Sequence, residues 1–402
     1  MAEFDFIELS KKYGQFDEPL IVVVIDGKEL DTKQGLNVTD AEVDLTSGYE
    51  ASIAEIILTG CFDPVTRSFD INKVKKYLYL GSTIKILLGY DVSVREVFRG
   101  FISAVHFVIT DSDSEEMPHI EVTAMDVKGI MMANRHSKRL NSKYYSDAVK
   151  EILDANAFLS QTDEKMNKFM EIVIDDTPDK KEGGGGAGGA GGGGAASSGG
   201  NSEETSDTRV EMVEESDYEF IVKAAKKYNY EFMSICGSLY FIKAKSNDTI
   251  LLETGPGLGM LNLDVGYDIT GLVKSVEVRN VDQDKGGQVK DKVKSSLKIS
   301  LGNKAKSLIE KQSLIYLDPT AGTKEEAGYR ASYLMEQINY RLGSLEANMN
   351  GLPELVPGRF IMIKNAGDPL NNKFYLTRVK HVIGNDGYIT FIEGKASSIE
   401  SK

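Results

Sequence analysis

The chain has 402 residues, enough for two or three domains, and its 41% hydrophobic and 27% charged residues are typical of a globular protein. Its 47 Lys and Arg against 61 Asp and Glu leave a net charge of −14, which argues against general binding of nucleic acids or anionic membranes. No apolar run approaches the roughly 18 residues of a membrane span. The acidic start MAEFDFIELS lacks the features of a secretory signal. We therefore expect synthesis in the cytoplasm without a signal peptide.

Cysteine and histidine usage argues against metal chemistry. Two cysteines, Cys61 and Cys236, lie too far apart in the sequence to form a disulfide framework or a paired-cysteine metal site. The four histidines have no second His or Cys at ligand spacing: His106, His119, His136 and His381. We expect no metal, no cofactor and ordinary structural roles for all four.

Residues 16–135 are predicted to be rich in β-strands. The runs of β-branched and aromatic residues that indicate strands are separated by turn residues, and they cover 20–25, 51–59, 84–88, 97–109 and 119–124.

A small α/β module is predicted over residues 144–243. One helix begins near Ser146, which is placed to cap it. A second begins at a capping box formed by Ser216 and Glu219, and a strand follows at 238–243.

The module is interrupted by the glycine-rich segment 183–200, which contains 12 of the 39 glycines. Such a segment cannot bury enough apolar area to offset its backbone entropy, so we expect a flexible coil. It is either a hinge or mobile loop with a function, or a tolerated insertion. Residues 201–219, which follow, carry eight carboxylates and one Arg.

Strands return after Gly271, and one helix interrupts them. That helix is predicted to be capped by Thr323, with Glu326 three residues later. The predicted strands cover 273–278, 297–300, 360–363, 374–383 and 388–393.

The two β-rich regions resemble each other. GSTIKI from Gly81 precedes FISAVHFVI from Phe101, and GRFIMI from Gly358 precedes YLTRVKHVI from Tyr375. The two glycines lie 277 residues apart and the two aromatic residues 274 apart, as a duplicated β-domain would leave them. Chance similarity between amphipathic strands is the alternative.

Motifs of known chemistry are absent or incomplete. The glycines of GPGLG, from Gly255 to Gly259, lack the spacing of a phosphate-binding loop, and we interpret them as a domain-joining turn. The acidic run 111–116 lacks the Gly and Glu of a calcium loop and is interpreted as a hairpin tip. There is no G-x-S-x-G, and no tryptophan of the kind common in sugar clefts. Several of the 18 tyrosines are close in sequence, which suits either strands or protein contacts: Tyr77, Tyr79, Tyr90, Tyr144 and Tyr145.

Four stretches carry a resemblance to a known family. They include Gly81 with Gly89-Tyr90 and Phe98-Arg99-Gly100, and they cover 80–102, 122–147, 215–241 and 355–390. In this order they resemble the late control protein D family, the baseplate hub proteins of contractile phage tails. They are also similar to the N-terminal hub region of VgrG-type spikes of type VI secretion.

The resemblance implies an α+β, β-dominated fold with two tube-like antiparallel β-barrels flanking a small α/β module. The expected limits are 1–15 for an N-terminal extension, 16–140 for the first barrel, 141–255 for the module with its insert at 183–200, and 256–402 for the second barrel with one helix. Tyr90 and Arg99 are interpreted as barrel packing and pairing rather than partner contacts.

The resemblance also implies a non-enzymatic homotrimer whose six barrels form a ring between the tail tube and the central spike. Further partners would be the baseplate wedge and the tape-measure protein, and the assembled particle would be a virion tail or a tail-like bacteriocin. VgrG proteins continue into an OB-like domain and a spike, whereas this chain stops at Lys402, so we expect the spike to be a separate chain. The glycine-rich insert and the first fifteen residues lie outside the family pattern.

Three alternatives remain open at this stage. The first is a VgrG-like hub that carries effectors in a secretion system. The second is a tail-associated cell-wall hydrolase, which needs an inserted catalytic domain. The third is an acidic, β-rich carbohydrate-binding module. We assign no catalytic, cofactor-binding or metal-binding residue.

Overall fold

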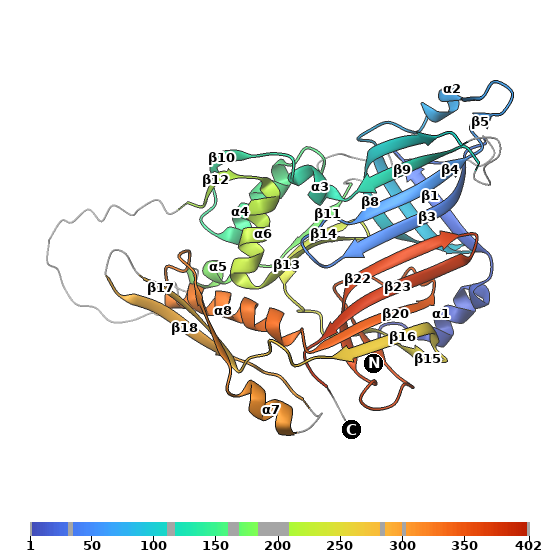
Figure 1. Ribbon diagram of the computed structural model, residues 1–402. Coiled ribbons are helices and arrows are strands. Elements are labelled where there is room, and N and C mark those ends of the chain that lie inside the picture. The colour runs from blue at the N-terminus through green and yellow to red at the C-terminus, as the bar shows by residue number, and fades with distance from the viewer. Residues whose placement is uncertain are drawn as a thin grey trace, which may run out of the picture.

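The computed structural model describes residues 2–30, 35–110, 117–159, 169–183, 209–281, 286–299 and 303–399 (Figure 1). The fold is α+β and dominated by strands, which confirms the predicted class. Its main feature is a 13-stranded sheet with the order β2-β1-β7-β8-β9-β4-β3-β22-β21-β15-β16-β20-β23. An additional pairing between β22 and β23 divides this sheet into two halves.

The second half is a closed six-stranded barrel. Its strands are bonded in the cyclic order β22-β21-β15-β16-β20-β23, and the pairing of β23 with β22 closes the cycle. One strand departs from the antiparallel expectation, because β15 runs parallel to β21. The six strands are β15 (Ile250–Pro256), β16 (Gly259–Tyr267), β20 (Gly343–Asn350), β21 (Phe360–Ile363), β22 (Lys373–Gly384) and β23 (Gly387–Ala396).

The first half is a curved six-stranded sheet with the order β1-β7-β8-β9-β4-β3. Its β3 strand, which the sequence analysis missed, alternates buried Ala41, Val43 and Leu45 with acidic outward residues. That alternation suits a strand with one face in the core. The strands are β1 (Pro19–Ile25), β3 (Asn37–Thr46), β4 (Ile53–Thr59), β7 (Thr83–Tyr90), β8 (Ser93–Val108) and β9 (His119–Met125). Short elements complete this half: β2 (Lys28–Glu29), β5 (Phe62–Asp63), β6 (Ser68–Phe69) and α2 (Ile71–Val74).

The two halves repeat each other strand by strand. Strands β3, β4, β7, β8 and β9 correspond to β16, β20, β21, β22 and β23, and the neighbouring pairs match in direction. The Gly81 amide donates to the Ile102 carbonyl at 2.8 Å, and the Gly358 amide donates to the Leu376 carbonyl at 2.9 Å. These are the positions that the sequence repeat equates, so the structure confirms the internal repeat.

Each half has two β-bulges whose places correspond to those in the other half. The ladder of β8 with β9 shifts between Ile102 and Ala104, and that of β22 with β23 shifts between Leu376 and Arg378. A second shift lies between Val38 and Asp40 on β3, and its counterpart lies between Met260 and Asn262 on β16. Because a bulge changes the register of every later residue, matched bulges align the two repeats residue by residue.

An α/β module lies between β9 and β15 and has its own apolar core. Helix α6 has the predicted capping box of Ser216 and Glu219. The cap predicted for α4 is wrong: Tyr144 is the N-cap, and Ser146 lies inside the helix, where its amide donates to Thr177 Oγ1. The elements are α3 (Val127–Met131), β10 (His136–Arg139), α4 (Tyr145–Ala155), β11 (Glu171–Ile174), α5 (Pro178–Gly183), β12 (Glu211–Glu215), α6 (Asp217–Tyr228), β13 (Tyr230–Ile235) and β14 (Ser238–Lys243).

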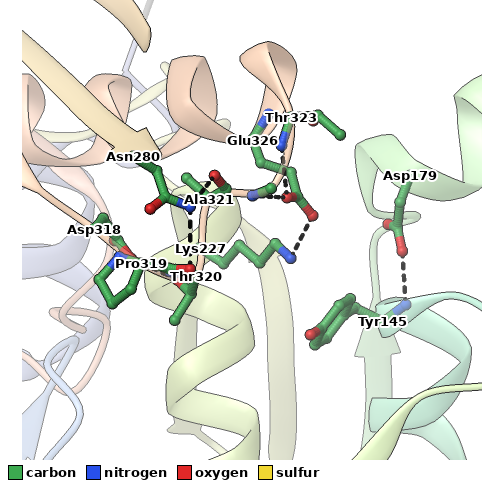
Figure 2. Close-up of polar contacts among 11 residues, drawn as sticks. Tyr145, Asp179, Lys227, Asn280, Asp318, Pro319, Thr320, Ala321, Thr323 and Glu326 are labelled. Atoms are coloured by element: carbon green, nitrogen blue, oxygen red, sulfur yellow. Dashed lines mark hydrogen bonds and ion pairs between the residues drawn. The ribbon is translucent and has the colours of Figure 1, made fainter. Parts of the chain in front are cut away.

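A second insertion separates β16 from β20. Helix α8 has the predicted capping box of Thr323 and Glu326. The Glu326 carboxylate also forms an ion pair with the Lys227 ammonium of α6, at 2.6 Å (Figure 2). The strand predicted at 297–300 is wrong for its described residues, because Lys298 forms only an isolated bridge to Ser398. The elements are β17 (Ser275–Val281), β18 (Gln288–Lys294), α7 (Asn303–Ile309), β19 (Ser313–Leu317) and α8 (Lys324–Asn339).

The N-terminal residues pack on the second barrel. Phe4 bridges to Leu252 of β15, and α1 (Phe6–Lys12) and the short helix η1 (Gly14–Phe16) follow it. The buried Tyr13 hydroxyl donates to Glu354 Oε1 at 2.7 Å. The N-terminal helix therefore lies against the same barrel as the last strands of the chain (Figure 1).

Candidate interaction surface

The two halves are joined by direct strand pairing between β3 and β22. Residues 378–383 of β22 run antiparallel to residues 46–41 of β3, and His381 lies opposite Val43. Arg378 Nε donates to Asp44 Oδ1 at 2.7 Å, and Lys380 forms an ion pair with Glu42. The junction thus combines a hydrogen-bonded ladder with ion pairs on its outer face. The pairing covers the β3 and β22 edges, which would otherwise be open to other strands.

The equivalent stretch of β8 pairs on one side only within the described residues. In the part of the chain that the structure describes, residues 104–108 pair with β9 alone. A groove of about 450 Å³ runs between residues 103–107 and the apolar side chains of Val74, Leu78 and Leu80 beside α2. Phe107 is 45% exposed and Ile109 is 62% exposed. This is an apolar edge open to a further strand.

The equivalent of β3 in the second barrel is also an open edge. Among the described residues, 262–267 of β16 pair with β20 alone, and β15 reaches only Gly259 and Met260. Leu263, Val265 and Tyr267 are partly buried apolar residues on this strand, and Asp264 is exposed. Within the described residues, the β8 edge of the first repeat and the β16 edge of the second are therefore both unpaired.

A polar cleft of about 780 Å³ lies where the barrels meet the α/β module and α8. The Lys245 ammonium lies 2.8 Å from Glu336 and 3.5 Å from Glu231, and it is 4.7 Å from the ring centres of Tyr340 and Tyr375. The Tyr375 hydroxyl donates to Glu231 at 2.6 Å. These residues come from three units of the fold, so the cluster connects them.

The ionisation of this cluster follows from burial and pairing. Burial raises the pKa of the Glu231 carboxyl, against the opposing effect of Lys245. Burial lowers the pKa of Lys245, but the attraction of Glu336 and Glu231 outweighs it, and the net shift is upward. The deepest charges of the cleft are thus paired with one another, so that none is left as an uncompensated buried charge.

The histidines occupy four separate places. His381 is fully buried in the second barrel, where Tyr388 and Thr390 contact its Nδ1 at 2.9 and 3.2 Å. Burial lowers the pKa of His381 to about 4, so the ring is neutral near pH 7. His106 is exposed on β8, while His119 and His136 are the first residues of strands β9 and β10. Within the described ranges, no group of three or more His, Cys, Asp or Glu side chains is placed to hold a metal ion.

The other sequence predictions concern the GPGLG segment, Tyr90, Arg99 and the acidic and glycine-rich segments. Gly255 to Gly259 do form a turn, but it links β15 to β16 within one barrel and does not join domains. Tyr90 is buried and donates to the Gly351 carbonyl at 3.0 Å, which agrees with packing. Arg99 pairs with Glu96 as predicted, and it also donates to the Phe169 carbonyl, so it connects the first half to the α/β module. Residues 111–116, 184–200 and the acidic 201–208 lie outside the described residues. None of the helices in the described part of the chain has the length and apolar character needed to cross a bilayer.

By sequence, one family model matches part of the chain. A family model described as the Alg8 N-terminal domain matches residues 18–179, which is less than half of the chain and does not assign it to that family. No curated protein matches the chain.

Comparisons by structure cover nearly the whole chain. A tail protein from Neisseria meningitidis MC58 matches with a TM-score of 0.62 and 10% identity, over 94% of this chain and 97% of that one. The 43 kDa tail protein of prophage MuSo2 from Shewanella oneidensis matches with a TM-score of 0.61 and 11% identity, over 93% and 97%. A type VI secretion component from E. coli matches with a TM-score of 0.53 and 11% identity, over 94% and 77%. At these identities the likeness shows a shared fold.

Proposed function

We propose that this protein is a structural baseplate hub of a contractile tail or a related injection machine. In this proposal it forms a homotrimeric, pseudo-sixfold ring that joins the tail tube to the central spike. The observation that carries the proposal is the residue-level repeat of five strands and two bulges within one chain. Three copies of a chain with two equivalent β-rich halves supply six equivalent positions, as a connector between sixfold and threefold structures needs.

The fold likeness to the tail protein from Neisseria meningitidis and to the prophage tail protein from Shewanella oneidensis, over 97% of each, supports this proposal. So does the sequence resemblance to the late control protein D family, which includes Gly81 and Gly358 at the equivalent turns. The proposed partners are a second and third copy of the chain, the spike, the tail tube, the baseplate wedge and the tape-measure protein. The proposed location is the baseplate of a virion tail or tail-like particle.

The proposed role is structural rather than catalytic. The cleft of about 780 Å³ has its deepest charges paired with each other, as Lys245 is with Glu231 and Glu336. His381, a residue type common in acid–base catalysis, is buried and bonded inside a barrel. The expected limits of 16–140, 141–255 and 256–402 need two shifts, because α3 (Val127–Met131) belongs to the core of the module and β15 (Ile250–Pro256) is a strand of the second barrel. We therefore propose 16–126 for the first β-rich half, 127–249 for the module and 250–402 for the second barrel with its insertion.

A second candidate is a hub that carries effectors in a secretion system. The fold match to the type VI secretion component, of which it covers 77%, favours this candidate. Both candidates share the ring, and they differ in the cargo that the particle delivers.

The solution mass tests the ring. Light scattering is performed on the purified chain alone and after co-expression with the candidate spike. We expect a trimer of three times 44.2 kDa. It forms either from the chain alone or in a complex with the spike, and in the complex the mass of the spike is added. A monomer in both samples contradicts the hub ring and favours a monomeric binding module. Clearing of a peptidoglycan suspension by the protein alone contradicts the structural role and favours the hydrolase.

A further inference from the structure

The unpaired edges of β8 and β16 are the repeat equivalents of the edges of β22 and β3, and β22 and β3 pair with each other within the chain. On the basis of the proposed hub ring, we propose that residues 104–109 of one copy pair antiparallel with residues 268–263 of the next copy. In this register Phe107 lies opposite Val265. The β16 edge of each copy thus receives the β8 edge of its neighbour, as β3 receives β22 within the chain.

The register follows from the matched ladders. The bulge on β8 equates Ala104 with Arg378, and therefore Phe107 with His381. The pairing of β3 with β4 and of β16 with β20 equates Val43 with Val265. His381 lies opposite Val43 in the chain. The equivalent pair between copies is then Phe107 and Val265.

Burial differs sharply between the paired edge and its open equivalent. His381 and Ile383 are 0% and 3% exposed, while their equivalents Phe107 and Ile109 are 45% and 62% exposed. Phe107 makes an edge-to-face contact with Phe69, with 5.3 Å between the ring centres. Covering these side chains with a neighbouring strand removes apolar area from water, which favours association.

The charged residues of the junction have a partial counterpart. Lys380 forms an ion pair with Glu42, and the repeat places His106 and Asp264 at these positions. Both His106 and Asp264 are exposed, so an imidazole on one copy can donate to a carboxylate on the next. The open groove beside α2 borders the β8 edge along which the incoming strand would lie.

The contact is heterologous, because one copy offers β8 and the other offers β16. Such contacts continue from copy to copy until the rotation closes them into a ring. A second copy of this chain is therefore the occupant that both edges require. Pairing also removes two open edges that would otherwise favour aggregation.

The test is a disulfide cross-link at opposed positions. The double variant Val108→Cys/Asp264→Cys places two thiols opposite each other in the proposed register, within the 4.4–6.8 Å that a disulfide spans between Cα atoms. The control Ala104→Cys/Leu263→Cys places them about five residues apart, or roughly 16 Å. Burial raises the pKa of the Cys61 thiol, and that of Cys236 to about 11, so the native cysteines should react slowly.

Each variant is co-expressed with the candidate spike, mildly oxidised and analysed on a non-reducing gel. We expect covalent dimers and trimers from the first double variant and fewer than a tenth as many from the control. A trimer by light scattering with no cross-link in the first variant overturns the register and leaves the hub ring intact. A monomer with and without the spike overturns both proposals.

A second pair of variants tests the same interface without cysteine. Phe107→Asp should reduce the trimer fraction at least tenfold. Phe391→Asp is the matched control, because Phe391 is a 36% exposed residue on β23 whose repeat equivalent, Glu121, already carries a carboxylate. Equal trimer fractions in the two variants, both with native circular dichroism, would contradict the proposed interface.

Discussion

Arg378 of the last barrel donates from Nε to Asp44 Oδ1 of the first sheet at 2.7 Å, across 334 residues of sequence. Its side chain is 51% exposed, and that of Asp44 is 23% exposed. The pair therefore lies on the surface of the ladder that joins the two repeats. Exposed ion pairs contribute little to stability by themselves, so the ladder and the buried side chains beneath it hold the junction.

Reversing one charge of this pair should weaken the junction measurably. In Arg378→Glu, a carboxylate would face Asp44 and lie near Glu393. We expect the free energy of unfolding to fall by about 1 kcal/mol, since like charges opposite each other are destabilising. Urea denaturation measures it, and Arg378→Glu/Asp44→Arg should regain most of the loss. Strict additivity of the two changes would show that the residues do not interact.

Removing Lys245 should cost far more than removing an exposed lysine. Lys245→Met leaves Glu231 buried without its cation, and breaking a buried pair in this way costs about 3–5 kcal/mol. Lys364→Met is the control, since Lys364 lies 3.7 Å from Glu253 on the surface and its loss should cost at most about 0.5 kcal/mol. Urea denaturation compares them. Equal losses in the two variants would mean that the cluster does not connect the three units.

Buried His381 should make the protein less stable in mild acid. Its folded pKa is about 4, below the ordinary 6.5, so the unfolded chain binds more protons between these values. The corresponding stability is present above pH 6.5 and is lost as the pH falls toward 4, by about 3 kcal/mol in total. His381→Gln should remove this part of the pH dependence in denaturation at pH 7 and pH 4.5. An unchanged slope in the variant would contradict the assignment.

The two equivalent turn glycines should differ in their tolerance of a side chain. Both Gly81 and Gly358 have positive φ, at 86° and 80°, so alanine costs about 1–2 kcal/mol at either. A Cβ at Gly358 would also lie 2.7 Å from Met233 Sδ, while one at Gly81 meets nothing within 4 Å. Gly358→Ala should therefore lower the thermal midpoint more than Gly81→Ala. In a Met233→Ala background the difference should disappear.

Local sequence patterns predicted several elements correctly because their causes are local. The capping boxes at Ser216 and Thr323 form as predicted, since the residues that bond are three positions apart. The prediction that Ser146 caps α4 is wrong because the Ser146 amide donates to the hydroxyl of Thr177, which lies on another segment far along the chain. Strands β3, β16 and β20 were missed because their polar faces interrupt the apolar runs used to find strands.

The sequence by itself determined the class of the fold and indicated a repeat between its two β-rich regions, because alternation, turn glycines and caps act over a few residues. Only the tertiary structure decided that β22 pairs with β3, that the GPGLG turn stays inside one barrel, and that the equivalent edges of β8 and β16 are open. Strand partners are set by the packing of distant segments against a shared core. The periodicity of a strand shows which face is buried, but it does not identify the strand beside it.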